Sequence, residues 1–517
     1  MLTRHRGTTA KVARDEDMHL PLHAPAVETV NIKKIKDTGM IAEALSWIEG
    51  LDKKTNLKKG QRTEARSEDI EKLEAAGVIE RCTKEQIRVT GSLFSVVEAE
   101  KGRRRPIYWP KALNRALEDN IPQVELSDSI EHAQVEKNIW AATFDLKASF
   151  FQIELPPRTR ELFGLMTNCG THRFKRLPMG FSASPFIMNE VTKLCAATGV
   201  ENVRTDVYID NVRFTSKSKE LVEKASQIFR ERCAEFGATL NVEDGNAPHQ
   251  SGEFLGLHFD YVNGTVKLGK KTMTKLRNAR VMEKATKREY LAMFGLTLFC
   301  TRALRIQPAR YFNQMKFIRK RCVGEELDEE ISIWPSCVDG WVSWLNELRK
   351  NTPTRHEPGD ADHPDATIFT DASTVGWGAV LIKGSSVHTV AGRWKEPIDC
   401  SEISTYEALA VSIAADAFAN LIRNCKTILL RTDNSPTLFT LKKGCAKEFE
   451  LNDAIRKCAE SFAKAAPHAA IFVMHVATKE NPADPLSRGQ ERLPPSALRS
   501  LGVVESGELR RVFTHCG

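Results

Sequence analysis

The sequence lacks the features of membrane-spanning and secreted proteins. Its longest nearly uninterrupted apolar run, residues 291–300, is too short to span a bilayer. The first twenty residues include basic side chains but no apolar stretch typical of a signal peptide. We therefore expect a protein of the cytoplasm or nucleus that is not secreted and has no membrane partner.

Cysteine and histidine metal motifs are also absent. The 12 cysteines include no Cys-x-x-Cys pair and no cluster at zinc spacing. Disulfide frameworks are typical of short secreted chains, so we interpret these cysteines as buried, reduced thiols. A nucleic-acid-binding zinc knuckle is excluded.

Positively charged residues only slightly outnumber negatively charged ones. The 75 Lys and Arg residues exceed the 67 Asp and Glu residues by only eight, which permits a polyanionic partner without requiring one. The chain has 517 residues, of which 41% are apolar, so it is long enough for about three globular domains. No internal repeat or low-complexity tract is evident.

The pattern of apolar residues, turn formers and charges predicts an α+β protein that is divided into several segments of unequal size. We expect a basic N-terminal arm (residues 1–60), a mixed α/β block (61–257), a mostly helical block (258–350), a linker rich in Pro, Asp and His (351–365), a second α/β block (366–490) and a C-terminal tail (491–517).

Two aspartates of the first α/β block fall near the ends of predicted strands. Asp145 ends an apolar strand, and Asp210 lies in residues 203–216, which predict a hairpin with its turn at Asp210 and Asn211. If the two strands are neighbours, the carboxylates converge, and such a pair is stable mainly with a divalent cation between them. Either aspartate alone could equally be a turn residue.

Four motifs surround these aspartates in a fixed order: DLKASFFQIEL, FKRLPMGFSASPF, YIDN and EFLGLHFD. With IEKLEAAGVIERC and KGRRRPIYWPKALN upstream, they resemble the fingers and palm of reverse transcriptases encoded by retrotransposons. The resemblance covers about residues 65–345. It implies a right-hand polymerase fold, with fingers and palm at 61–257 and a thumb or connection region at 258–350.

The resemblance implies that Asp145 and Asp210 are catalytic and ligate two Mg²⁺ ions, for which Mn²⁺ could substitute. Its implied partners are an RNA template, a DNA primer and deoxynucleoside triphosphates. It also implies a set of substrate-binding positions: Lys101, Arg105, Leu146, Phe150, Pro178, Met179, Gly180, Tyr208, Asn211, Phe254, Leu255 and Gly256.

Some of these positions have a competing interpretation. Lys101 and Arg105 would contact incoming phosphates, but residues 103–105 could instead belong to a solvated basic turn. Phe150 would form an aromatic wall beneath the sugar, or could simply be core. The backbone carbonyl of Leu146 would complete a metal shell. The remaining segments would line the template–nucleotide pocket (residues 177–180) and support the primer end (residues 254–256).

The chain departs from the family at two places. Asn211 stands where the family usually has a second Asp, which removes one negative charge beside the metals and predicts a slower polymerase. Glu243 and Asp244 follow Asn241, where many relatives have a Lys that assists pyrophosphate departure. Asp206 should lie about 13 Å from Asp210, too far to replace the missing carboxylate.

Four acidic residues fall in the second α/β block: Asp371, Glu407, Asp433 and Asp484. Each has an ordinary interpretation by itself. Ser404 and Glu407 form the pattern of a capping box, Asp433 could be a turn residue and Asp484 could cap a helix.

Their order and contexts resemble the RNase H domain that follows many reverse transcriptases. TDAS-x-x-GWGAV and NPAD-x-LSR are close to the form seen in tyrosine-recombinase (DIRS-like) retrotransposons. The resemblance implies an α/β RNase H-like domain with a mixed sheet. It also implies that the four residues are catalytic, hold two Mg²⁺ ions and act on an RNA/DNA hybrid.

The resemblances thus predict an RNA-directed DNA polymerase, a nucleotidyltransferase, joined to an RNase H endonuclease and of retrotransposon origin. One alternative retains RNase H activity but makes the polymerase site a degenerate nucleic-acid cradle, because Asn211 replaces an Asp. Another is a nucleic-acid-binding protein in which neither site is active.

Overall fold

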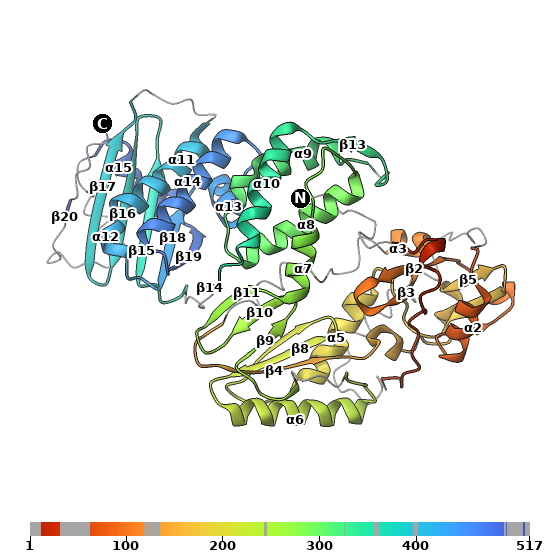
Figure 1. The fold of residues 1–517 in the computed structure, drawn as a ribbon. Helices are drawn as coiled ribbons and strands as arrows, with labels where there is room; N and C mark the ends of the chain where they lie inside the picture. Colours follow the sequence, from red (N-terminus) through yellow and green to blue (C-terminus); the bar gives the residue numbers. More distant parts are fainter. Residues whose placement is uncertain are drawn as a thin grey trace. The chain divides into compact units, whose positions relative to one another are not determined.

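The computed structural model describes residues 12–30, 63–117, 124, 135–241, 246–324, 326–355, 361–395, 402–490, 493 and 510–511. The chain divides into two compact units (Figure 1). The N-terminal unit consists of residues 8–133 and 137–264, and the C-terminal unit consists chiefly of residues 265–517. Most of the expected N-terminal arm and C-terminal tail lies outside the described residues, as do Glu243 and Asp244.

A three-stranded antiparallel sheet is the centre of the N-terminal unit. Its order is β4 (Trp140–Asp145), β8 (Asn211–Ser216) and β7 (Arg204–Tyr208). Helix α6 (Lys219–Phe236) packs on β4 and β8, and α5 (Ser184–Ala196) packs on α6 and β7. The rings of Phe144, Phe214 and Phe229 meet edge to face beneath the sheet, with centroids 5.1–6.0 Å apart.

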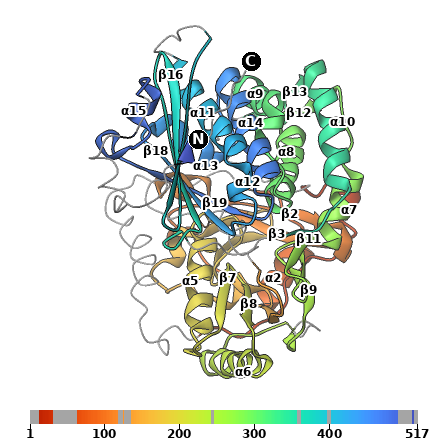
Figure 2. The same cartoon turned by 90° about the vertical axis from the view of Figure 1, so that its left-hand side faces the viewer.

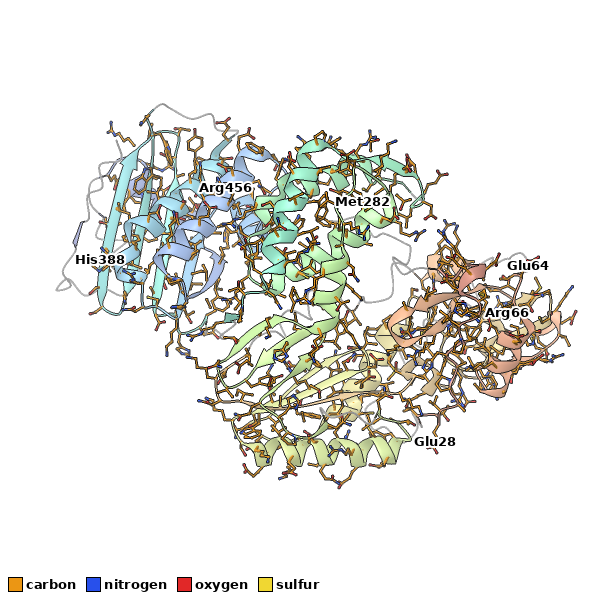
Figure 3. All side chains as sticks on the ribbon, in the orientation of Figure 1. Glu28, Glu64, Arg66, Met282, His388 and Arg456 are labelled. Atoms are coloured by element: carbon orange, nitrogen blue, oxygen red, sulfur yellow. The ribbon has the colours of Figure 1, made fainter. Side chains whose placement is uncertain are left out.

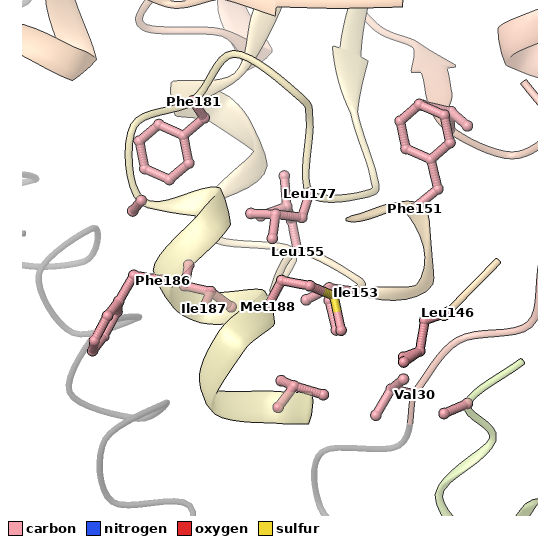
Figure 4. Close-up of a cluster of buried hydrophobic side chains, with 14 of the residues drawn as sticks. Val30, Leu146, Phe151, Ile153, Leu155, Leu177, Phe181, Phe186, Ile187 and Met188 are labelled. Atoms are coloured by element: carbon pink, nitrogen blue, oxygen red, sulfur yellow. The ribbon is translucent and has the colours of Figure 1, made fainter. Parts of the chain in front are cut away.

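A large apolar core surrounds the ends of these elements. Figure 4 shows part of it, including Val30, Leu146, Phe151, Ile153, Leu155, Leu177, Phe181, Phe186, Ile187 and Met188. Because Val30 also donates its backbone N–H to Gln152 O at 2.8 Å, a segment far upstream is fixed against the short helical turn (Ser149–Gln152) that follows β4. Burial of this kind contributes about 25 cal/mol per Å² of apolar surface.

Smaller elements precede the sheet or fall between its strands along the chain. They are α2 (Ser67–Ala75), β1 (Ile79–Arg81), β2 (Ser92–Glu98), β3 (Arg103–Trp109), α3 (Lys111–Ala116), β5 (Gly164–Thr167) and β6 (Gly170–Phe174). The antiparallel β2–β3 hairpin turns at residues 99–102, so Arg103, Arg104 and Arg105 lie in a strand. The interpretation of these arginines as a solvated turn was therefore wrong. Arg104 is buried and pairs with Asp69 at 2.9 Å.

The C-terminal unit begins with a largely helical region. Its helices are α7 (Lys270–Asn278), α8 (Lys287–Ala303), α9 (Phe312–Arg321) and α10 (Pro335–Arg349). Two short antiparallel pairs accompany them: β11 (Thr265–Leu268) with β14 (Thr354–Arg355), and β12 (Lys284–Thr286) with β13 (Glu330–Ser332). Tyr311, Trp344 and Trp341 stack in sequence at 4.0 and 4.9 Å, which gives the helices a rigid aromatic centre.

A mixed sheet follows, in the order β19-β18-β15-β16-β17-β20. The strands are β15 (Ala366–Ala372), β16 (Gly376–Lys383), β17 (Ser386–Arg393), β18 (Thr427–Thr432), β19 (Ala470–His475) and β20 (Arg510–Arg511). Strands β15, β16 and β17 are antiparallel, whereas β18 runs parallel to β15 and β19 runs parallel to β18. The mixed sheet confirms the predicted fold class of this block.

Helices cover both faces of the sheet. Side chains alternate along a strand, so Ile368 joins the core under α11 (Ile403–Ala417) and α14 (Phe449–Ala465), while Phe369 joins the opposite core with α15 (Asp484–Ser487). Figure 2 shows α15 and α11 on either side of β16. Two further helices, α12 (Ala419–Ile422) and α13 (Ser435–Lys443), lie beside them.

The helical region packs against α14 within the same unit. Asn452 donates to Ala309 O at 2.8 Å, and the rings of Phe312 and Phe449 meet edge to face. The outward face of α14 is charged, and Arg456, labelled in Figure 3, pairs with residues one turn away on either side. The described parts of the expected linker, residues 351–355 and 361–365, lie within this unit.

No helix among the described residues has the length and apolar character needed to cross a membrane. The ten cysteines that the structure describes are free thiols, and eight of them are buried.

Gly378 provides a test of how α15 packs on the sheet. A Cβ atom at this position would lie 2.6 Å from Leu486 Cβ and 2.8 Å from Ser487 N. We expect Gly378→Ala to lower the free energy of unfolding by about 1–3 kcal/mol. In contrast, Gly295→Ala in α8 meets no atom within 4 Å and should stabilise the protein by about 0.5–1 kcal/mol. Urea unfolding followed by circular dichroism measures both, and equal midpoints would contradict the packing described.

Candidate functional site

Asp145 and Asp210 lie side by side at one end of the N-terminal sheet. Asp145 is the last residue of β4 and pairs in register with Asn211, the first residue of β8. The backbone N–H of Leu146 donates to Asp210 O at 3.1 Å. The structure therefore brings together the two aspartates, hereafter the N-terminal carboxylate pair, which the sequence places 65 residues apart.

The turn that carries Asp210 differs from the expected one. Tyr208 pairs with Asn211, so the turn residues are Ile209 and Asp210, and the expected turn at Asp210 and Asn211 was wrong by one residue. Ile209 has a φ of +57°, which is unfavourable for a β-branched residue. Its backbone N–H donates to Asn189 Oδ1 at 2.9 Å, which holds this conformation.

Neutral donors surround the N-terminal carboxylate pair. Ser149 Oγ donates to Asp210 Oδ2 at 2.8 Å, and the Asn211 amide donates to Asp210 Oδ1 at 3.0 Å. Asn241 donates to Asp145 Oδ2 at 2.6 Å. Burial raises the pKa of Asp210, and the bond from Ser149 opposes that increase. Neither Ser149 nor Asn241 was singled out from the sequence as a contact of the carboxylates.

Arg105 belongs to the same electrostatic environment. Its guanidinium donates to Glu98 Oε1 at 2.5 Å across the β2–β3 hairpin, and its positive charge lowers the pKa of Asp210. An arginine whose charge acts on Asp210 is suited to a ligand with phosphate groups. Lys101 lies at the exposed tip of the hairpin.

The other expected positions of this unit lie in different environments. Leu146 is buried, and Phe150 is half-buried and packs against the core. Gly180 has a φ of +99°, and a Cβ there would lie 2.3 Å from Tyr108 O. Tyr108 N also donates to Met179 O, so the loop containing Pro178, Met179 and Gly180 is joined to the end of β3.

Phe254, Leu255 and Gly256 form the tip of a hairpin. They join β9 (Ser251–Phe254) to β10 (Leu257–Asp260), and Leu255 and Gly256 both have positive φ values, the geometry of a type I′ turn. The hairpin is tied to the sheet by Arg213 of β8, whose guanidinium lies 4.8 Å from the centre of the Phe254 ring.

Arg213 is fully buried and makes an ion pair with Asp206 at 2.6 Å. Asp206 therefore neutralises Arg213 and is not available as a replacement for a second Asp at position 211. No sequence pattern indicates this pair, because an Arg within a strand is usually exposed.

A second acidic site lies in the C-terminal unit. One carboxylate oxygen each of Asp371, Glu407 and Asp433 lies within 4.8 Å of the other two. Asp371 comes from β15, Glu407 from α11, and Asp433 follows directly after β18. The parallel pairing of β15 and β18 brings the two aspartates to the same end of the sheet. These residues are hereafter the C-terminal carboxylate cluster.

The cluster raises the pKa values of its own members. Burial, with the negative charges of Asp433 and Asp484, raises the pKa of Asp371 to about 7. Burial and the neighbouring charges of Asp371 and Asp433 raise the pKa of Glu407 to about 9. Both side chains are only 4% exposed, so water cannot offset the repulsion.

Asp484, the fourth expected residue, is not one of the three residues that meet within 4.8 Å. It is the first residue of α15, and its two oxygens accept bonds of 2.9–3.1 Å from the Arg488 guanidinium. Its charge nevertheless raises the pKa values of Asp371 and Glu407. Asp484 therefore lies beside the cluster, paired with an arginine.

The capping-box interpretation of Glu407 was wrong. Helix α11 begins at Ile403, and its N-cap is Glu402, so Ser404 lies inside the helix and cannot serve as the cap. Glu407 instead points into the cluster, where its Oε2 atom is buried and has no hydrogen-bond partner.

The donor set of the C-terminal carboxylate cluster fits a divalent cation. Three carboxylates provide the hard oxygen ligands that Mg²⁺ and Mn²⁺ prefer, and the buried Glu407 Oε2 needs a partner. The N-terminal carboxylate pair offers two such ligands.

Comparison with known proteins finds a family match within the first unit. Residues 97–259 match the family model described as Reverse transcriptase (RNA-dependent DNA polymerase). The match includes both members of the N-terminal carboxylate pair. Residues 97–259 are therefore similar to the reverse transcriptase family.

The similar sequences are polyproteins of viruses and retroelements. An enzymatic polyprotein of Cestrum yellow leaf curling virus is 31% identical over 182 residues, which are 35% of this chain and 28% of the polyprotein. A retrovirus-related Pol polyprotein from transposon 412 of Drosophila melanogaster is 26% identical over 158 residues, 30% of this chain and 12% of the polyprotein. The matched region thus spans less than a third of either relative.

Solved structures of the foamy viral protease-reverse transcriptase are also similar. The complex with an RNA/DNA hybrid has a TM-score of 0.49 at 14% identity and covers 90% of this chain and 63% of that one. The complex with dsDNA has a TM-score of 0.47 at 16% identity and covers 87% of this chain and 95% of that one.

The raised pKa of Glu407 predicts a pH-dependent stability in the absence of metal. Because the folded pKa of about 9 exceeds the usual value of 4.5, the folded state holds a proton that the unfolded state loses. The free energy of unfolding should therefore fall as pH rises between these values. We expect Glu407→Gln to be more stable than the unmodified chain by about 1–3 kcal/mol at pH 8 in EDTA, and by less at pH 5.

Urea unfolding at both pH values measures this difference. Glu450→Gln, a change at an exposed position of α14, serves as the control and should have little effect. A Glu407→Gln protein that is less stable than the unmodified chain at pH 8 would show that the cluster is not electrostatically strained.

Proposed function

We propose that this chain is an RNA-directed DNA polymerase with ribonuclease H activity, and that both reactions are two-metal phosphoryl transfers. The observation that carries the proposal is the presence of two separate carboxylate sites, one in each unit, with the first inside the segment matched by the reverse transcriptase family. The proposed partners are an RNA template, a DNA primer, deoxynucleoside triphosphates and an RNA/DNA hybrid.

In the polymerase reaction, Asp145 and Asp210 would hold Mg²⁺, with the Leu146 carbonyl as a further ligand. Bound Mg²⁺ would supply Lewis-acid activation of the primer 3′-hydroxyl and neutralise the leaving pyrophosphate. Arg105 is the best-placed phosphate contact, because its charge already acts on Asp210. Lys101 would add a second positive charge at the tip of the same hairpin.

The remaining positions would shape the polymerase site. Phe150 would lie beneath the incoming sugar, and Tyr208 and Asn211 would flank the primer end. The other proposed contacts are the loop that would line the template–nucleotide pocket (Pro178, Met179 and Gly180) and the hairpin tip that would support the primer (Phe254, Leu255 and Gly256).

In the ribonuclease reaction, Asp371, Glu407 and Asp433 would hold Mg²⁺. Asp484 would become a fourth metal ligand once its ion pair with Arg488 is broken. An exposed pair such as Asp484 with Arg488 contributes only about 0–1 kcal/mol, so a cation could compete for the aspartate. We further propose an origin in a tyrosine-recombinase (DIRS-like) retrotransposon, supported by the TDAS-x-x-GWGAV and NPAD-x-LSR motifs.

A second candidate function retains RNA cleavage but makes the N-terminal unit a nucleic-acid cradle with little polymerase activity. The observation that favours it is Asn211, which places an amide beside Asp210 where a further carboxylate would strengthen cation binding. Primer extension by the unmodified protein decides between the two candidates.

Paired assays on one preparation test the two active sites separately. We expect Asp210→Asn to abolish primer extension on an RNA template and leave hybrid cleavage within about twofold, because removing a metal-binding carboxylate affects its own site. Asp433→Asn should do the reverse. Each variant is the folding control for the other, and loss of both activities in either variant would contradict the assignment of two independent sites.

Asn211→Asp tests the weakened polymerase site. The added carboxylate should strengthen cation binding and raise the extension rate on the order of tenfold, equal to ~1.4 kcal/mol of transition-state stabilisation. Asn211→Ala removes the amide without adding charge and should give no increase. A rate unchanged or lowered by Asn211→Asp, measured at several Mg²⁺ concentrations, would show that the charge at this position does not limit catalysis.

A further inference from the structure

One short segment of the C-terminal unit contacts the acidic residues of its site through three different side chains. Asn481 Nδ2 donates to Asp433 Oδ1 at 3.3 Å, Ser487 Oγ donates to Asp371 Oδ2, and Arg488 binds Asp484. Residues 481–488 thus engage three acidic residues that come from β15, the end of β18 and α15 itself.

Asn481 and Ser487 are buried polar side chains whose hydrogen bonds lead into the site. Asn481 is 3% exposed and Ser487 is 1% exposed. A buried polar group is costly unless it is hydrogen-bonded, and Asn481 also donates to Thr370 O at 3.0 Å on the strand that carries Asp371. The hydroxyl oxygen of Ser487 also lies 2.9 Å from the backbone carbonyl oxygen of Asp484.

The backbone that carries these side chains is held firmly against the sheet. Ala483 and Leu486 are buried in the core on that face, and Gly378 leaves no space between β16 and α15. Ser373 Oγ donates to Ser487 O at 2.8 Å, which fixes the end of α15 without touching a carboxylate. The two donors are therefore presented in defined positions.

We propose that Ser487 and Asn481 are positioning residues of the C-terminal carboxylate cluster. Ser487 sets the orientation of the Asp371 carboxylate, and Asn481 sets that of Asp433, so that both face Glu407 across the space that a divalent cation would occupy. This inference rests on the proposed metal-dependent function of the cluster. Residues that orient metal ligands typically affect metal affinity or activity by about 10–100-fold.

A purely structural role would produce a different result. If Ser487 only held α15 on the sheet, then removing the Ser373 hydroxyl, which bonds the same helix end, should have a comparable effect. Ser373→Ala is therefore a matched control, because it removes one hydroxyl from the same neighbourhood without removing a donor to an acidic side chain.

The experiment measures Mn²⁺ binding by calorimetry, without nucleic acid, on the full chain. All proteins carry Asp145→Asn and Asp210→Asn, so that binding reports on the C-terminal unit. We expect Ser487→Ala and Asn481→Ala each to weaken Mn²⁺ binding about tenfold, and Ser373→Ala to change it less than twofold. Thermal unfolding in EDTA verifies that each variant is folded.

A second measurement uses hybrid cleavage by the same proteins. The Mn²⁺ concentration that gives half-maximal cleavage should rise about tenfold in Ser487→Ala and Asn481→Ala, while KM for the hybrid stays within twofold. Two variants at separate positions keep the test decisive if one of them does not fold.

The possible failures are distinguishable. If Asp371→Asn binds Mn²⁺ as tightly as its parent, the proposed metal site itself is wrong, and the positioning role falls with it. If Asp371→Asn no longer binds Mn²⁺ but Ser487→Ala and Asn481→Ala behave like Ser373→Ala, the proposed metal site is supported and the positioning role is overturned.

Discussion

Repulsion between carboxylates that water cannot screen is the constraint on which the C-terminal unit depends. Asp371 and Glu407 are almost fully buried, and Asp433 lies against them. Such an arrangement opposes folding unless protons or cations neutralise it, so the surrounding sheet and helices must hold it in place. The mixed sheet does so by ending β15 and β18 at the same edge, and α11 supplies the third carboxylate from one face.

The two units offset the repulsion and burial of their carboxylates in different ways. In the N-terminal unit, Ser149, Asn211 and Asn241 each donate to one of two carboxylates, so local hydrogen bonds offset part of the cost of burial. In the C-terminal unit three carboxylates converge, and Glu407 Oε2 has no donor at all. The first site is thus lower in charge and better satisfied within the protein, whereas the second has the greater need of a cation.

Sequence patterns predicted the positions of strands and acidic residues better than the contacts between them. Asp145 ends its strand as expected, and Asp371, Glu407 and Asp433 lie within the expected second α/β block. The turn at Ile209 was missed because a β-branched residue with positive φ is unfavourable and depends on the hydrogen bond that its backbone N–H donates to Asn189. Contacts such as Asn241 with Asp145 join residues 96 positions apart, and no local pattern indicates them.

The buried Arg213 of the N-terminal unit limits which substitutions its neighbours can tolerate during evolution. Arg213 of β8 contacts the rings of Phe254 and Phe259 in the β9–β10 hairpin and neutralises Asp206 of β7, so three residues on three other strands depend on one guanidinium. Loss of either charge alone leaves its partner buried and uncompensated, at a cost of about 3–5 kcal/mol. Substitutions at these positions should therefore occur together. Related sequences should either keep all four residues, Arg213 included, or replace them together with apolar residues.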